Sequence, residues 1–151
     1  MGTIVVGVDG SKGSVGALRV AIDEARLRGT SVKAVNAWHI PAIVYEATWA
    51  ALPIDREVYP KVAQEVLDKS LAEAGAAGSG IDVTTVVREG QAADVICEEA
   101  KGATLLVVGS RGFGGFRGLL LGSVSQQCAH HAPCPVLIVP DRASKDGSAS
   151  S

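Results

Sequence analysis

The chain has 151 residues, enough for one domain with a sizeable core, and 47% of them are hydrophobic, which excludes a disordered protein. Its 14 basic and 16 acidic residues give a formal net charge of −2, and aromatic residues make up 4%, so the composition does not favour binding to nucleic acid. No apolar run approaches the ~20 residues of a membrane span, and no signal peptide precedes the first strand. We therefore expect a cytoplasmic protein that makes no contact with membranes.

Strands and helices are predicted to alternate along the first half of the chain. Residues 3–8 (TIVVGV) form a continuous, largely β-branched run, which is typical of a strand buried on both faces. Apolar residues at helical spacing predict a helix over residues 14–28, and residues 31–37 read as the second strand. Residues 40–55, with two prolines, are expected to form a long connection that lies over either a site or an edge of the sheet.

The second half continues the alternation and ends in a polar segment. Helices are predicted over residues 58–74, 92–100 and 123–131. Strands are predicted over residues 81–88, 104–109 and 136–139. The first of these helices carries its predicted apolar stripe at Val62, Val66, Leu67, Leu71 and Ala74. Residues 141–151 are polar and of low complexity, so we expect a disordered tail after one domain that covers residues 1–140.

The order of these elements predicts an α/β fold. Strands that alternate with helices form a doubly wound parallel sheet, here five-stranded, with helices on both faces of a single domain. In such sheets, ligands bind at the carboxyl ends of the strands where the strand order reverses. Two turns with ligand-binding chemistry follow strand ends, one at residues 8–11 and one from Gly109 onward. If the two strands are neighbours, both turns face one crevice.

The three cysteines, Cys97, Cys128 and Cys134, form no CxxC pair and are expected to be inert or buried thiols. His130 and His131 next to Cys134 are a weak candidate for a metal site, because no second pair of ligands is evident. We therefore expect no metal at this cluster.

The glycine-rich segment at residues 105–125 (LLVVGSRGFGGFRGLLLGSVS) runs from a strand to the start of a helix. A helix N-terminus offers unpaired N–H groups and a partial positive charge, which suit a phosphate. The segment is not a P-loop, because no lysine follows Gly122. Nor is it a dinucleotide fingerprint, which would need glycine where Arg117 stands.

The spacing that does fit is Gly109, two residues, Gly112, nine residues, then Gly122 and Ser123. Together with the segment VVGVDGS at residues 5–11 and the closing APCPV at 132–136, it resembles the universal stress protein family over residues 3–139. The resemblance implies a fold like that of the adenine nucleotide alpha hydrolases. Because the glycines and the hydroxyl are intact, it further implies membership of the family's ATP-binding branch.

The resemblance implies a phosphate site in the second turn. Gly109 and Gly112 let the loop pass close to the ribose and phosphates, and Arg111 and Arg117 are candidate partners for phosphate charge. The phosphates are expected to be held at the helix start by Gly122, Ser123, Val124 and Ser125. The hydroxyls of the two serines are able to donate to phosphate oxygens.

The resemblance places the rest of the nucleotide near the first two strands. Val8 and Ala37 flank the adenine, and Asp9 bonds the ribose hydroxyls or helps to place Mg²⁺ that arrives with ATP. Gly7 and Ser110 complete the predicted set of cofactor-binding residues. Asp9 also suits a second role, in which it shapes the turn or caps the next helix, and ligand contact is favoured over it.

One position departs from the family pattern. Phe113 stands where many relatives have histidine, which removes a possible polar contact within the loop. Phe113 and Phe116 are interpreted as packing residues rather than adenine stackers, because the family's adenine lies toward the first two strands.

The leading functional hypothesis is an ATP-binding regulatory protein of the stress response. The resemblance implies a homodimer that pairs through the last strand, Val136–Val139, and covers an apolar edge. The regulatory partner protein is not indicated. Two alternatives stay open: a slow ATP hydrolase, and an interaction module that ignores nucleotide. No catalytic residue is assigned, because Asp9 is the only carboxylate that the motif ties to the crevice.

Overall fold

The computed structural model describes residues 2–40, 55–112 and 121–140. These residues form five strands: β1 (Thr3–Gly7), β2 (Ser31–Trp38), β3 (Val83–Glu89), β4 (Leu105–Gly109) and β5 (Val136–Val139). They also form four α-helices and one short 3-10 helix: α1 (Lys12–Arg28), α3 (Val58–Ala74), η1 (Ala76–Gly78), α4 (Ala92–Glu99) and α5 (Ser123–His131). The predictions for Phe113, Phe116, Arg117, the 141–151 tail and most of the 40–55 connection lie outside the described residues.

All five strands are parallel and lie in the order β3-β2-β1-β4-β5. The chain builds from β1 outward through β2 to β3, then returns to the other side of β1 for β4 and β5. The strand order therefore reverses between β1 and β4, whose central residues pair at Val5 and Leu106. The predicted doubly wound five-stranded sheet is confirmed, and the two glycine-containing turns follow neighbouring strands.

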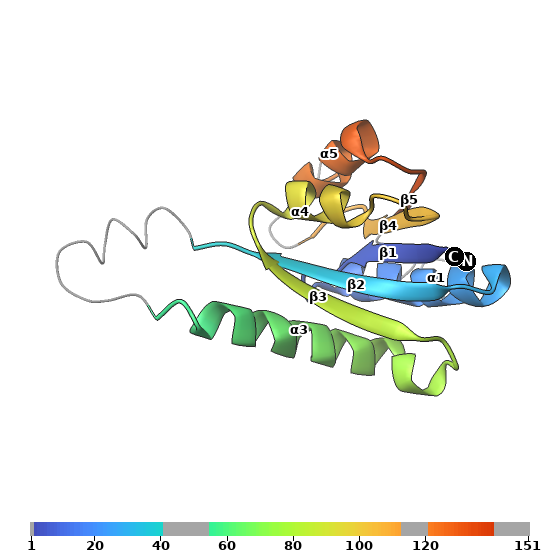
Figure 1. Ribbon diagram of the computed structural model, residues 1–151, viewed down its shortest axis with the longest axis horizontal. Coiled ribbons are helices and arrows are strands. Elements are labelled where there is room, and N and C mark those ends of the chain that lie inside the picture. Colours follow the sequence, from blue (N-terminus) through green and yellow to red (C-terminus); the bar gives the residue numbers. More distant parts are fainter. Residues whose placement is uncertain (1, 41–54, 113–120, 141–151) are drawn as a thin grey trace, which may run out of the picture.

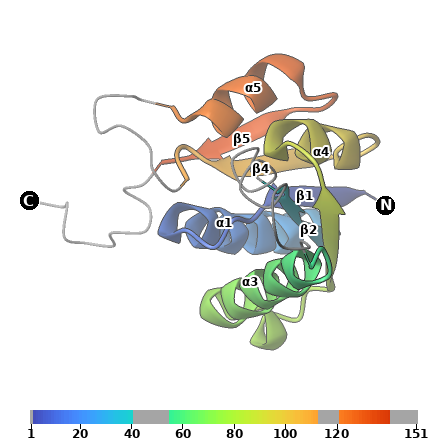
Figure 2. The same ribbon diagram turned by 90° about the vertical axis from the view of Figure 1, so that its left-hand side faces the viewer.

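The helices cover both faces of the sheet. α1 and α3 lie on one face and α4 and α5 on the other (Figures 1 and 2). Alternate strand residues face the two layers: Ile4 and Val6 join the core under α1, whereas Val5 joins the core under α4 and α5. Because both faces are covered, β1 needs the continuous apolar run that its sequence shows.

The start of α1 lies two residues earlier than predicted. Ser11 is the N-cap, and its side chain accepts a hydrogen bond from the N–H of Ser14. At the other end Gly29 adopts φ 67°, a left-handed conformation that glycine reaches without the steric cost of a Cβ, so the helix ends there as predicted.

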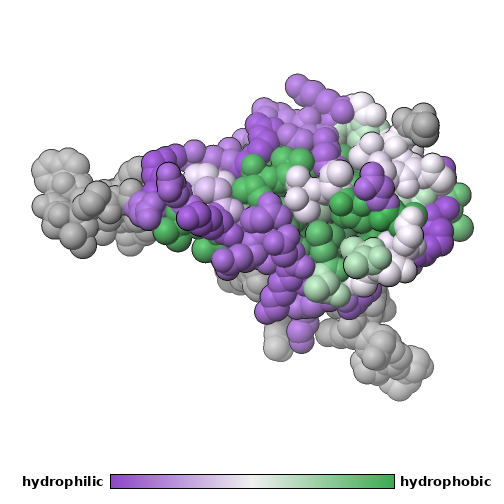
Figure 3. Space-filling model, turned by 60° about the horizontal axis from the view of Figure 1, so that its bottom comes forward, coloured by the Kyte–Doolittle hydropathy of each residue, from purple (hydrophilic) through white to green (hydrophobic). Residues whose placement is uncertain are grey.

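Helix α3 differs from its predicted apolar stripe. Val62 is 50% exposed, and the buried residues of α3 are Ala63, Leu67 and Ser70. Leu27 of α1, which also follows the apolar spacing, is 80% exposed. The side of the molecule seen in Figure 3 carries separate hydrophobic patches with hydrophilic residues between them. The prediction of a helix was right, but part of its assigned buried face was wrong.

Within the described segments, none of the helices is both long enough and apolar enough to cross a lipid bilayer.

Candidate functional site

A cavity of about 420 Å³ opens at the carboxyl ends of β1, β2 and β4, where the strand order reverses. Its volume is in the range of small-molecule sites. Its lining residues come from these strands, from α4 and from the starts of α1 and α5: Gly7, Val8, Asp9, Ser11, Ser14, Val35, Ala37, Ala92, Ile96, Val108, Gly109, Arg111, Gly112, Gly122, Ser123, Val124 and Ser125. Among the described residues, every predicted cofactor-binding residue is in this set except Ser110, which is buried.

One wall of the cavity is apolar. Val35 and Val108 come from strands on either side of β1, and Ala92 and Ile96 come from the facing side of α4. The wall depends on Gly7, because a Cβ at this position would lie 2.7 Å from Cδ1 of Ile96. The missing side chain at residue 7 therefore leaves room for the end of the Ile96 side chain over β1. The result is a dry surface suited to a flat, largely apolar ring system.

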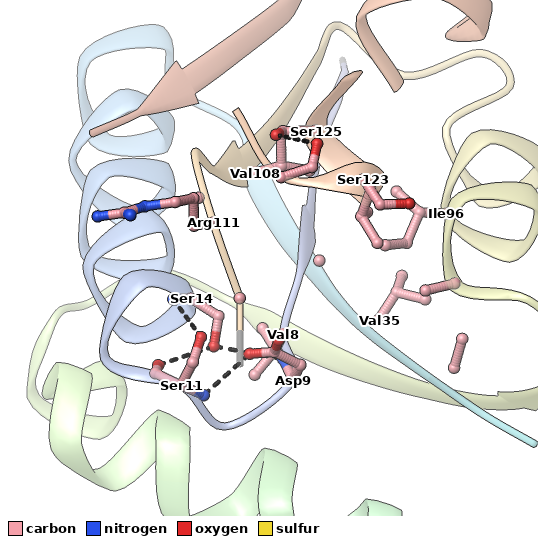
Figure 4. A pocket seen from close by; sticks show the side chains of 17 residues that line it. Val8, Asp9, Ser11, Ser14, Val35, Ile96, Val108, Arg111, Ser123 and Ser125 are labelled. Carbon is pink, nitrogen blue, oxygen red and sulfur yellow. Dashed lines mark hydrogen bonds between the residues drawn. The ribbon is translucent and has the colours of Figure 1, made fainter. Parts of the chain in front are cut away.

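The turn after β1 is held by its own side chains. The carboxylate of Asp9 accepts a hydrogen bond from Ser11 N through Oδ1 (2.9 Å), so Asp9 does shape the turn. Ser14 Oγ accepts from the N–H groups of Asp9 and Gly10 at 3.3 and 3.2 Å, and donates to Ser11 O at 3.0 Å. Most N–H groups at this turn therefore have protein partners (Figure 4).

Asp9 also joins the two turns. Its second carboxylate oxygen lies against Gly112, where any Cβ would overlap it. The glycine at 112 is therefore required for Asp9 to reach across to the second turn. Asp9 lines the cavity as well, so the turn-shaping role and the predicted ligand contact are compatible in this geometry.

The start of α5, unlike that of α1, has no side-chain cap. Its N-cap is Gly122, which has no side chain to accept from the N–H groups of the first turn, and this turn contains no acidic residue. Ser123 is exposed and accepts a hydrogen bond from Gln127 Nε2 (3.1 Å), which leaves its hydroxyl proton for another acceptor. The N–H groups of Ser123, Val124 and Ser125 thus start a helix that has no side-chain cap, a feature that is able to bind an anion.

Ser125 has a structural role in addition to lining the cavity. It is 2% exposed, and its hydroxyl lies 2.8 Å from Ser110 O and 3.0 Å from Gly122 O. Ser110 O also accepts from Gly122 N at 2.6 Å. The single hydroxyl proton of Ser125 is therefore engaged by main-chain carbonyls, so its N–H rather than its hydroxyl is the donor left for a ligand. Ser110 contributes by anchoring the start of α5 to the end of β4.

Gly109 contributes to packing. A Cβ at Gly109 would lie 3.0 Å from the backbone C and O atoms of Gly13 in α1, so this glycine allows the end of β4 to approach the helix closely. The structure thus gives Gly109 a packing reason that accompanies its place in the motif.

Two formal charges line the cavity, those of Asp9 and Arg111. Figure 4 shows the Arg111 side chain extending toward α1, on the side away from Ser123 and Ile96. Across the described residues, no group of three or more His, Cys, Asp or Glu side chains is placed to hold a metal ion, and this includes the cluster of His130, His131 and Cys134.

The sequence reasoning missed six lining residues: Ser11, Ser14, Val35, Ala92, Ile96 and Val108. The serines follow Asp9 in the first turn and have the capping spacing, so their pattern was available in the sequence. The four apolar residues were not recognisable as site residues, because they resemble any other core position until the strand order is known.

Comparison with known proteins agrees with this geometry. The family model for the universal stress protein family matches residues 1–140. The universal stress protein Rv2623 of Mycobacterium tuberculosis is 36% identical over 135 residues, which are 89% of this chain and 44% of that protein. The chain thus spans less than half the length of the curated relatives that it matches.

The solved structures that are similar to this chain include universal stress proteins. A universal stress protein crystallised in complex with cAMP is 29% identical, with a TM-score of 0.65 over 93% of this chain and 97% of that one. The universal stress protein from Archaeoglobus fulgidus in complex with dAMP is 24% identical, with a TM-score of 0.67 over 92% and 98% of the two chains, which supports the fold. The family model covers nearly the whole described domain, and the chain therefore belongs to the universal stress protein family.

Proposed function

We propose that this chain is a regulatory protein that binds ATP in the cavity between β1, β4 and α5. The observation that carries the proposal is the start of α5, where Gly122 leaves the first-turn N–H groups without a side-chain cap at the rim of a cavity with an apolar wall. Such a helix start is a site for phosphate.

The two ends of the cavity match the two ends of an adenine nucleotide. The apolar wall of Val35, Ala92, Ile96 and Val108 suits the adenine ring, next to the predicted contacts at Val8 and Ala37. Asp9 lines the same cavity and has one carboxylate oxygen beyond its bond to Ser11 N. That oxygen is an acceptor for ribose hydroxyls.

The comparisons support an adenine nucleotide as the ligand class. The relative that is 29% identical was crystallised with cAMP, which has an adenine, a ribose and one phosphate. ATP is our more specific proposal, and it rests on the family resemblance of the glycine spacing. Mg²⁺ fits as a companion of the phosphates: it keeps several waters and takes few carboxylates, and Asp9 is the carboxylate that lines the cavity.

A regulatory role is favoured over catalysis by the state of Asp9. Phosphoryl transfer to water needs a residue that positions the nucleophile. Asp9 is the carboxylate available in the cavity lining, and one of its oxygens is already engaged by the turn. We propose slow hydrolysis at most. Steady-state release of phosphate that is well above that of a Gly122→Ala variant would overturn this part.

Two variants at one position test the phosphate site. Proline is well tolerated at the first position of a helix but has no N–H, so Ser123→Pro removes both the hydroxyl and one anion-binding N–H. Ser123→Ala removes the hydroxyl alone and is the matched control. We expect titration calorimetry with Mg-ATP to show at least a tenfold weaker affinity for Ser123→Pro than for Ser123→Ala.

The unmodified protein is tested first. Heat denaturation of freshly purified chain followed by ion-pair chromatography of the released small molecules is expected to yield ATP near one per chain. Parallel titrations with AMP and cAMP show whether the additional phosphates of ATP contribute affinity. If no nucleotide is released and no heat accompanies titration of Mg-ATP, AMP or cAMP, the proposal fails and the chain is an interaction module of the same fold.

We further propose a homodimer through β5. This strand is an edge of the sheet, and its residues Val136, Leu137 and Ile138 are half-buried. An uncovered apolar edge strand favours pairing with a second copy. Light scattering is expected to give a dimer for the parent chain and for Ile138→Val, and a monomer for Ile138→Asp with an unchanged circular dichroism spectrum. A folded, dimeric Ile138→Asp protein would exclude this interface.

A further inference from the structure

Three thiols meet behind the wall of the cavity. Cys97 lies on α4, Cys128 on α5 and Cys134 between α5 and β5. The Sγ atoms of Cys97 and Cys128 are 4.0 Å apart: the Cys97 thiol donates a hydrogen bond to Cys128 Sγ, and no disulfide joins them. All three side chains belong to the same apolar cluster under α4 and α5.

The thiols differ in their access to solvent. Cys128 is fully buried, and burial together with the neighbouring Cys97 thiol raises the pKa of Cys128 to about 12. Cys97 and Cys134 are half-buried. Cys97 is therefore the member of the close pair that a small oxidant in solution reaches, whereas Cys128 is held as a protonated thiol beside it.

We propose that Cys97 and Cys128 form a reversible disulfide when the protein meets a peroxide. In the first step the sulfur of Cys97 attacks the peroxide, the O–O bond breaks, and Cys97 becomes a sulfenic acid while an alcohol or water leaves. In the second step Cys128 loses its proton and attacks the Cys97 sulfur, which forms the S–S bond and releases water. A dithiol reductant reverses the oxidation.

The bond would act on the cavity because of where the two residues lie. Cys97 directly follows Ile96 of the apolar wall, and Cys128 lies one helical turn after Ser125. The sulfur atoms must approach from 4.0 Å to about 2.05 Å, so α4 and α5 are drawn together by up to about 2 Å. This movement narrows the space between Ile96 and Val124. Resting on the proposed function, we expect the oxidised protein to bind ATP about tenfold more weakly.

The test is peroxide titration of the folded, full chain. Remaining thiols are alkylated after quenching, and the bridged peptides are mapped by mass spectrometry without reduction. We expect a Cys97–Cys128 bridge in the parent chain and in Cys134→Ser, which leaves the close pair intact. We expect no bridge in Cys97→Ser. Since the second step needs the thiolate of Cys128, the bridge should form faster at pH 9 than at pH 7.

Three results would overturn the proposal. One is a folded parent chain whose Cys97 and Cys128 stay alkylatable after treatment with excess peroxide. Another is a bridge that forms only between Cys97 and Cys134, and is therefore absent from Cys134→Ser. The last is a Cys97–Cys128 bridge that a dithiol reductant does not reopen in the folded protein.

The effect on the cavity is measured separately. Titration calorimetry of reduced and oxidised Cys134→Ser compares their affinities for Mg-ATP. Equal affinities would remove the link to the cavity. If the reduced protein does not bind ATP, the proposed function fails, while peptide mapping still decides whether the disulfide exists.

Discussion

The starts of α1 and α5 occupy equivalent places in the fold, yet among the described residues α1 has a side-chain cap and α5 has none. Both follow central strands at the point where the strand order reverses. At α1 the hydroxyls of Ser11 and Ser14 take up N–H groups of the turn and the helix. At α5 the N-cap is Gly122, which offers the first-turn N–H groups no side-chain acceptor.

Because the two helix starts differ in their caps, position in the fold is not sufficient to define a phosphate site. A parallel sheet brings several helix N-termini to one edge, and side-chain caps decide which of them has donors to spare. In this chain the side chains of the turn at α1 satisfy its own N–H groups, and under the proposed function the uncapped turn at α5 supplies the donors for an anion.

The largest effect is expected from a substitution at Gly122 that gives α5 a side-chain cap. In Gly122→Asp the new carboxylate accepts from the first-turn N–H groups and repels phosphate, so we expect Mg-ATP affinity to fall about 100-fold. Gly122→Ala is the matched control: its Cβ meets Arg111 Cα and Ser110 O at 3.3 and 3.4 Å, a tight fit shared by both variants. Titration calorimetry that finds equal affinities for the two variants would contradict the role given to α5.

A smaller effect is expected from removing the support at α1. Ser14→Ala removes the acceptor of the N–H groups of Asp9 and Gly10 from two partly buried hydrogen bonds, which should cost about 1 kcal/mol of unfolding free energy. Ser125→Ala is the control, since it also removes a buried hydroxyl but leaves Ser110 O bonded to Gly122 N. Urea denaturation should rank Ser14→Ala as the less stable variant, and the opposite ranking would show that the α1 turn does not depend on this network.

At neutral pH the smallest effect is expected at Cys128, whose thiol is fully buried in the apolar cluster under α4 and α5. Burial, together with the neighbouring Cys97 thiol, raises the pKa of Cys128 from 9.0 to about 12, so the unfolded chain loses this proton at a lower pH than the folded chain. Stability is therefore unaffected well below pH 9 and falls as the pH rises from about 9 to about 12. Cys128→Ala should show a shallower fall in urea denaturation over this range. Parallel pH profiles for the two proteins would rule out the effect.

Much of the fold could be predicted because local signals agree with the tertiary structure. The bounds of α5 and β5 were predicted to the residue, since Gly122 opens the helix and Pro133 and Pro135 separate it from the strand. The buried face of α3 could not be predicted in full. This helix is apolar on more than one side, and its position over the edge of the sheet, beside β2 and β3, leaves Val58 and Val62 exposed.

The candidate site also contains residues that could be predicted from the sequence and residues that could not. Gly112 and Gly122 were predictable from their spacing in the sequence. In the structure a Cβ at Gly112 would overlap the Asp9 carboxylate, and one at Gly122 would fit tightly against Arg111 Cα at 3.3 Å. Ile96 and Val108 were not predictable, since only the strand order brings α4 and β4 to the same cavity. The hydroxyl of Ser125 shows a third case, in which the residue was placed correctly but its proton is engaged by the main chain.

The contact between Gly7 and Ile96 has an evolutionary consequence. A side chain at residue 7 and the full reach of residue 96 compete for the same volume, since the two would approach to 2.7 Å. Because Cδ1 is the end of a flexible side chain, a side chain at residue 7 would require Ile96 to turn away or to be replaced by a shorter residue. Relatives with alanine or serine at position 7 are therefore expected to carry a shorter residue at position 96, or a helix displaced outward, so the two positions are expected to covary.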